Sequence, residues 1–245
     1  MKDNYLFTYT DDTYIKYVKR LIESVENNTT NISKIIVLYY GKKPPKELIR
    51  KNIIVQQFYV EDEINKRNIN YLFFNTLPEI ISTYIFDNAI ICDADIYFKR
   101  NFENFNNDGL FYSSYYPTYS GPANEIKIHN IKNNILKRFP SSSYNKFKFK
   151  MLDNFEGLSI NGGFFGGEYI SLLNRLKKIL IELNKNKNEL IELGFYVDEA
   201  ILIKYFDYQR DKLLKYSDIN INPKIEDMKN RDIFHLNNKE LYKYL

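Results

Sequence analysis

Four short apolar runs in the N-terminal part of this chain constrain its fold more than any other feature. They cover residues 5–9, 35–39, 53–55 and 89–92. The run 35–39 is apolar along its whole length, which is typical of a strand buried on both faces in a parallel sheet. Helical patterns separate these runs, so the chain repeats a strand–helix–strand unit. The sequence therefore predicts an α/β fold with a mostly parallel central sheet flanked by helices.

Apolar residues three and four positions apart predict the helices. Thr10-Asp11-Asp12 can cap the first of them, whose buried face is expected to contain Tyr14, Val18, Leu21, Ile22 and Val25. Further helices are expected over residues 71–83, despite Pro78, over 172–183 and over 197–206.

The length and composition suit one large domain or two small ones. A chain of 245 residues, 44% of them hydrophobic, can build a full core. The net charge of +4 is too low to indicate nucleic-acid binding, but it is compatible with an anionic small molecule or an anionic surface. No apolar run reaches the roughly 20 residues of a membrane span, and the N-terminus lacks the apolar segment of a signal peptide. Cys92 is the one cysteine and fits a reducing compartment, so a cytoplasmic protein is expected.

Asp93-Ala94-Asp95 follows the apolar run 89–92 and leads into the apolar residues 96–98. Side chains two residues apart on a strand point to the same face, so the two carboxylates are expected to converge at the carboxyl end of this strand. Converging carboxylates favour a hard divalent cation, which can also hold phosphate oxygens. The alternative is a charged strand exit, because Asp is common in turns. Asp11 and Asp12 also follow a predicted strand, and ligands of open α/β sheets bind beyond such ends.

The C-terminal half carries further patterns. Residues 161–167 contain four of the 9 glycines, which suits either a backbone passing close to a sugar or tight turns around a buried Phe164-Phe165 strand. Asp198-Glu199 begins a predicted helix, where acidic residues also favour the helix dipole. Residues 233–239 predict a short strand and a basic turn. Residues 113–156 lack apolar periodicity and are either a lid or a disordered loop.

These motifs, in this order, resemble those of the GT-A glycosyltransferases, which transfer a sugar from a nucleotide-sugar donor. The polar turn 10–14, the block 88–96 and the closing segment 234–239 are similar to the family 8 group, which includes glycogenin and lipopolysaccharide galactosyltransferases. The blocks 162–168 and 196–206 resemble the histo-blood-group transferases. The resemblance covers most of the chain. It implies a single GT-A domain, with a nucleotide-sugar-binding half over 1–110 and an acceptor-binding half over 111–245.

The resemblance also implies a metal site and a donor site. Asp93, Asp95 and His235 would bind Mn²⁺, with Mg²⁺ as the alternative, and the ion would neutralise the charge of the departing diphosphate. Lys239 would place a positive charge at the phosphates. The other donor-binding residues implied are Phe7, Thr8, Tyr9, Thr10, Tyr14, Ala94, Asn161, Gly162 and Gly163. The resemblance implies that the backbone of residues 7–10 contacts the edge of the donor base. Tyr14 would stack on the base.

The implied reaction moves a hexose from UDP-glucose or UDP-galactose to a glycan or glycolipid, with retention of anomeric configuration. Glu199 is expected at the reacting centre, with Asp198 as the second candidate. Peripheral membrane association is compatible with this function, and no nucleic-acid partner is expected. One alternative is a non-catalytic nucleotide-sugar-binding module, because the closing segment lacks the Gly, Pro and Trp usual in family 8. Another is a haloacid-dehalogenase-type phosphatase, although its D-x-D normally lies near the N-terminus.

Overall fold

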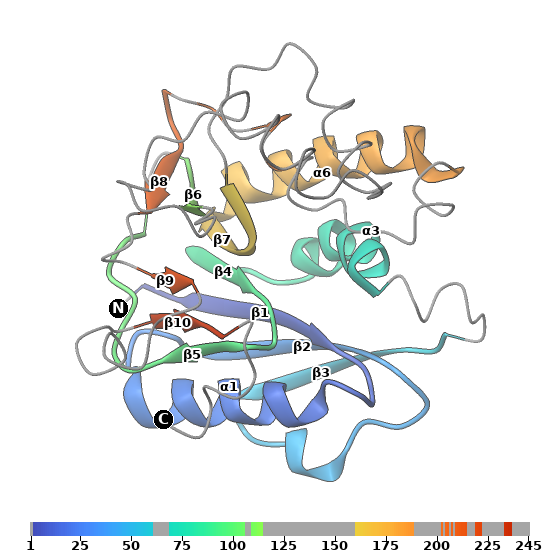
Figure 1. Cartoon of the computed structure of the whole chain (residues 1–245), viewed down its shortest axis with the longest axis vertical. Helices are drawn as coiled ribbons and strands as arrows, with labels where there is room; N and C mark the ends of the chain where they lie inside the picture. The colour runs from blue at the N-terminus through green and yellow to red at the C-terminus, as the bar shows by residue number, and fades with distance from the viewer. Residues whose placement is uncertain are drawn as a thin grey trace, which may run out of the picture.

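The computed structural model describes residues 2–60, 69–105, 109–114, 160–188, 202, 204–205, 207, 209–214, 219–221 and 233–236. Figure 1 shows two sheets, with helices on both sides of the larger one. The strands are β1 (Asn4–Thr10), β2 (Lys34–Tyr40), β3 (Ile53–Phe58), β4 (Asn88–Cys92), β5 (Ile96–Phe98), β6 (Leu110–Ser114), β7 (Ile160–Glu168), β8 (Lys212–Leu214), β9 (Asn220–Ile221) and β10 (Ile233–His235). The helices are α1 (Ile15–Asn28), α3 (Ile69–Ser82), α6 (Tyr169–Lys185) and the short 3₁₀ helix η1 (Lys46–Leu48).

The larger sheet has seven described strands in the order β3-β2-β1-β4-β7-β6-β8. The pairs β1–β2, β2–β3, β1–β4 and β6–β8 are parallel, whereas β7 is antiparallel to both β4 and β6. The predicted mostly parallel central sheet with flanking helices is therefore confirmed.

Both faces of this sheet are covered, because side chains alternate along each strand. Tyr5 and Phe7 of β1 belong to an apolar cluster with α3 and α6, whereas Leu6 belongs to a second cluster with α1. Figure 1 shows α3 and α6 on one side of the sheet and α1 on the other. The buried face of α1 contains Val18, Leu21, Ile22 and Val25, as predicted. Tyr14 is not on this face and is 48% exposed, so that part of the prediction is wrong.

Other element boundaries differ from the sequence predictions. The predicted helix 71–83 is α3, which begins at Ile69 and continues through Pro78. The third strand extends beyond residue 55 and ends at Phe58. β3 is at the edge of the described sheet, so polar residues can occupy its second half: Gln56 is half-buried and Gln57 is exposed. None of the described helices combines the length and the apolar character that a membrane span requires. Most of the predicted lid or loop, and the start of the predicted helix 197–206, lie outside the described residues.

The order of strands reverses between β1 and β4. From β1 the chain adds β2 and β3 on one side, and it then returns to place β4 on the other side of β1. β1 pairs with β2 as far as Thr10, but its ladder with β4 ends where Phe7 meets Ile91. Ligands of open α/β sheets bind at such a reversal, beyond the carboxyl ends of the strands.

The glycine-rich block 161–167 lies within one strand, β7, and does not form the pair of turns considered above. Where β6 advances by one residue, from Tyr112 to Ser113, its partner on β7 changes from Phe165 to Asn161. Residues 162–164 therefore have no partner in this ladder, and they lie at the carboxyl end of β4. Glycine is required further along β7, because a Cβ at Gly166 would lie 2.0 Å from the carbonyl oxygen of Ala89.

The second sheet has the order β5-β10-β9 and is attached to α1. Two side chains of α1 bind the backbone of Phe98 in β5. Ser24 Oγ accepts the Phe98 N–H at 3.1 Å, and Asn28 Nδ2 donates to the Phe98 carbonyl oxygen at 2.9 Å. Because β10 pairs with β5, these contacts also determine where the C-terminal strand lies.

Candidate functional site

Asp93-Ala94-Asp95 connects the two sheets. β4 ends at Cys92 and β5 begins at Ile96, whose N–H donates to the carbonyl oxygen of Asp93 at 3.3 Å. The motif is therefore a turn, and the expected convergence of its carboxylates along one strand is wrong. The physical reason is that the chain must change direction to leave one sheet and join the other. The position of the motif at the carboxyl end of β4, beside β1, is confirmed.

Asp93 is held by residues from three elements. The Tyr9 hydroxyl of β1 donates to Asp93 Oδ1 at 3.0 Å. The Asp93 N–H donates to the carbonyl oxygen of Gly163 in β7 at 2.9 Å. The ring of Tyr9 stacks on Phe73 of α3, with 4.3 Å between the centroids and 26° between the planes. β1, β7 and α3 therefore orient this carboxylate together.

Asp95 contacts the C-terminal part of the chain. The residue is 8% exposed, and its carbonyl oxygen accepts the N–H of Leu236 at 3.0 Å. His235 is opposite Ile96 in the antiparallel pair of β10 and β5, so its backbone lies beside the motif. The His235 side chain and the whole of Lys239 lie outside the described residues.

The thiol of Cys92 is close enough to sense both carboxylates. Burial raises the pKa of the Cys92 thiol, and the negative charges of Asp93 and Asp95 raise it further. A buried thiol with a raised pKa is chemically inert. The carboxyl end of β4 therefore holds two acidic side chains near one buried thiol.

The donor set at the carboxyl end of β4 fits a hard divalent ion in part. Carboxylate oxygens are ligands that Mn²⁺ and Mg²⁺ accept. Within the described ranges, no group of three or more His, Cys, Asp or Glu side chains is arranged to hold a metal. A third protein ligand, the role predicted for His235, is therefore not among the described side chains.

Asp11 forms the turn that leads from β1 into α1. Its Oδ1 accepts the N–H of Thr13 at 2.9 Å, the hydroxyl of Thr13 at 2.7 Å and the N–H of Tyr14 at 3.0 Å. This turn makes Tyr14 the residue that caps α1, which explains why its ring is not on the buried face. The ring lies 5.5 Å from that of Tyr17. Stacking of Tyr14 on a donor base stays a prediction.

Asp12 links the ends of β1 and β2. It accepts a hydrogen bond from the hydroxyl of Tyr39, which also donates to the carbonyl oxygen of Lys43 at 2.9 Å. Burial, together with the hydrogen bond to Asp12, raises the pKa of Tyr39 to about 12. This hydrogen bond joins the carboxyl ends of β1 and β2, and it occupies one carboxylate oxygen of Asp12, Oδ1.

The side chains of Phe7, Thr8 and Thr10 are buried, and that of Tyr9 is half-buried. Phe7 and Tyr9 face α3, so Thr8 and Thr10 face the opposite side of the sheet. Thr8 is 0% exposed and Thr10 is 1% exposed, so the backbone of these two residues is covered as well as their side chains. The predicted contact between this backbone and a donor base stays a prediction.

Thr8→Val is expected to stabilise the fold. Thr8 is 0% exposed, and its Oγ1 has no hydrogen-bond partner among the described residues. A buried unpaired hydroxyl costs about 1–3 kcal/mol, so urea denaturation should show a gain of about 1 kcal/mol. Thr10→Val is the matched comparison, because Thr10 Oγ1 donates to the carbonyl oxygen of Asp11 at 3.1 Å. Equal losses of stability in both variants would contradict the assignment of an unpaired hydroxyl to Thr8.

The structure brings some of the predicted site residues together, and others lie outside the described residues. The structure brings together Tyr9, Asp93, Asp95, Gly163 and the backbone of His235. Ala94 and Gly162 are buried, and each is next to a member of this group in the sequence. The backbone of Asn161 pairs with that of Ser113. Asp198, Glu199 and Lys239 lie outside the described residues.

Sequence reasoning missed the part that Tyr9 plays. Its backbone was expected to contact a donor, whereas its hydroxyl binds Asp93 and its ring packs on Phe73. The two residues lie in different elements, and no local pattern could have shown this contact. No model of a known protein family and no curated protein matches the chain. The chemistry of the site must therefore be argued from its own residues, which offer two carboxylates at the reversal point of an α/β sheet.

Proposed function

We propose that the chain is a metal-dependent glycosyltransferase with a GT-A fold. One observation carries this proposal. The acidic motif lies where the strand order reverses, and β5, the strand that follows the motif, pairs with β10, which ends in His235. A motif that binds a metal diphosphate needs this placement, because the ligand must reach the carboxyl ends of both β1 and β4. The order of strands, in which β7 is antiparallel to its neighbour β4, also supports the proposed GT-A fold.

In this proposal the residues divide the work of binding the donor. Asp93 and Asp95, with His235, would hold a divalent cation, and such a cation supplies charge neutralisation for a departing diphosphate. Tyr9 keeps Asp93 oriented towards the reversal point, and Lys239 adds a positive charge at the phosphates. The backbone of residues 8–10 and the ring of Tyr14 would receive the nucleoside.

The reaction proposed is the transfer of a hexose from UDP-glucose or UDP-galactose to a glycan or glycolipid, with retention. Glu199 would contact the reacting sugar and Asp198 is the second candidate. A carboxylate there can stabilise positive charge at the anomeric carbon or act as a nucleophile. Gly162 and Gly163 present no side chain beside the motif, so a sugar could approach their backbone closely.

Thermal unfolding with UDP, GDP and CDP, each with and without Mn²⁺, tests the binding part of this proposal. One nucleotide should stabilise the protein only when the metal is present. At about a hundredfold excess over Kd the gain is roughly 2.7 kcal/mol. Hydrolysis of a panel of nucleotide sugars then tests turnover. Binding without hydrolysis or transfer would favour the non-catalytic module, and no metal-dependent binding would overturn the proposal.

A further inference from the structure

The segment between β2 and β3 concentrates positive charge. Residues 41–52 contain five basic residues and one acidic residue, so they carry +4, which equals the net charge of the whole chain. The basic residues are Lys42, Lys43, Lys46, Arg50 and Lys51, and all five are exposed. We call this segment, together with Tyr59, the basic surface.

Several contacts hold the basic surface in one conformation. Gln57 Nε2 of β3 donates to the carbonyl oxygens of Gly41 at 3.1 Å and Lys42 at 2.6 Å. The Tyr39 hydroxyl binds the carbonyl oxygen of Lys43 at 2.9 Å, and Leu48 is buried in the core beneath α1. The segment therefore presents its charges on a pre-organised backbone, which lowers the entropy lost on binding.

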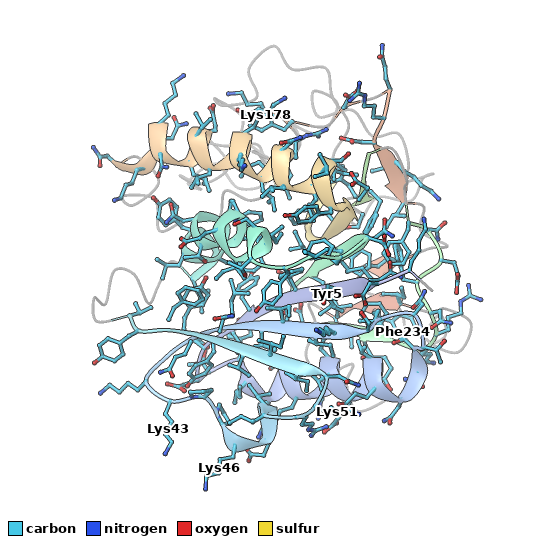
Figure 2. All side chains as sticks on the ribbon, turned by 180° about the vertical axis from the view of Figure 1, so that it is seen from behind. Tyr5, Lys43, Lys46, Lys51, Lys178 and Phe234 are labelled. Atoms are coloured by element: carbon cyan, nitrogen blue, oxygen red, sulfur yellow. The ribbon has the colours of Figure 1, made fainter. Side chains whose placement is uncertain are left out.

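Among the described residues, acidic groups pair with only part of this charge. Glu47 pairs with Lys19 of α1 at 3.4 Å, and Arg50 pairs with Glu26 of α1 at 2.7 Å. No described acidic side chain forms an ion pair with Lys42, Lys43, Lys46 or Lys51. Figure 2 shows Lys43, Lys46 and Lys51 at the same end of the molecule, pointing outwards. The ammonium groups of these three lysines therefore lie at one end of the molecule.

Large apolar side chains accompany these lysines. Ile49, between Leu48 and Arg50, is 67% exposed, and Tyr59 is 60% exposed. Tyr59 adjoins the start of the segment, because the carbonyl oxygen of the preceding Phe58 accepts the Gly41 N–H at 3.1 Å. Lysines in one segment with an exposed aliphatic side chain, next to an exposed Tyr, are typical of a protein surface that binds at a bilayer interface.

We propose that the basic surface docks the protein on an anionic lipid bilayer. The lysines would meet the negative headgroups, and Ile49 would enter the boundary between headgroups and acyl chains. A bilayer fits better than a nucleic acid, because an exposed isoleucine gains from leaving water but offers nothing to a phosphate backbone. This interaction needs neither nucleotide nor metal, so it stands apart from the glycosyltransferase proposal.

Sedimentation of the full chain with vesicles tests this docking. The protein should bind phosphatidylcholine vesicles that contain phosphatidylserine, bind pure phosphatidylcholine poorly, and lose binding as salt rises. Replacing Lys42, Lys43, Lys46 and Lys51 with Gln should weaken binding at least about tenfold, because each lysine near an anionic surface contributes severalfold. Ile49→Ser should weaken it severalfold without changing the charge.

The matched control removes the same charge from α6 and the residues after it. Lys177, Lys178, Lys185 and Lys187 are also exposed, and Figure 2 shows Lys178 at the opposite end of the molecule. Their replacement with Gln should leave vesicle binding within about twofold. The proposal is overturned if the α6 variant loses binding and the basic-surface variant keeps it, or if Ile49→Ser has no effect. Tighter, salt-sensitive binding to a short DNA duplex through the same lysines would also overturn it, in favour of a nucleic acid.

Discussion

Replacing Asp95 with Asn is expected to abolish the stabilisation by nucleotide that depends on Mn²⁺. The substitution keeps the size of the side chain but removes the negative charge that a divalent cation requires. The Asp95 carbonyl oxygen, which binds the N–H of Leu236, is retained, so the link to the C-terminal strand should persist. At a hundredfold excess of nucleotide over Kd, the unmodified protein should gain roughly 2.7 kcal/mol of stability when the metal is present. The variant should lose this gain, so that its unfolding temperature with metal equals the value without metal.

Glu79→Gln is the matched control for this prediction. Glu79 is an exposed carboxylate on α3, and its replacement removes the same charge away from the motif. The control should respond to nucleotide and metal as the unmodified protein does. A full metal-dependent shift in Asp95→Asn would remove Asp95 from the site. Loss of the shift in both variants would point to a general electrostatic effect.

Asp211→Ala is expected to lower the free energy of unfolding by about 3–5 kcal/mol, since it leaves a buried charge unpaired. The Asp211 side chain is 0% exposed, and it faces Arg175 of α6, which is 13% exposed, at 2.7 Å. The carboxylate also accepts the N–H of Leu110 at 3.0 Å and the N–H of Asp207 at 2.7 Å. One side chain therefore ties α6 to β6 and to the segment before β8.

Urea denaturation measures this effect, with Glu47→Ala as its control. Glu47 forms an exposed ion pair with Lys19, and such pairs contribute about 0–1 kcal/mol. The double variant of Arg175→Met and Asp211→Ala tests the coupling directly, because groups in contact deviate from additivity by about 0.5–3 kcal/mol. Additive losses, or a small loss in Asp211→Ala, would show that the pair is not a stabilising link.

The elements of the N-terminal half could be predicted because each carries its own repeat. β2 was expected over residues 35–39 and runs from Lys34 to Tyr40. α1 buries the predicted aliphatic residues, which recur every three or four positions. Tyr14 was misplaced because it fits the same spacing, but the turn that Asp11 forms begins the helix one residue later.

β7 shows where local patterns fail. Glycine disfavours strands, so one of the two alternatives for the four glycines in residues 161–167 was a pair of tight turns around a short Phe164-Phe165 strand. The glycines form a strand because its neighbours approach closely, as the contact between Gly166 and Ala89 shows. The ion pair of Arg175 with Asp211 could not be predicted either, because the partners are separated in sequence and share no motif.

By itself, the sequence determined β1 to β4, the helices α1, α3 and α6, and the placement of an acidic motif at the end of a buried strand. Those features depend on the period of apolar residues, which is local. Only the tertiary structure decided that the motif is a turn, that the Tyr9 hydroxyl binds Asp93, and that the strand ending in His235 pairs beside Asp95. These contacts join residues distant in sequence. They follow from the way the two sheets and their helices pack, which no local period encodes.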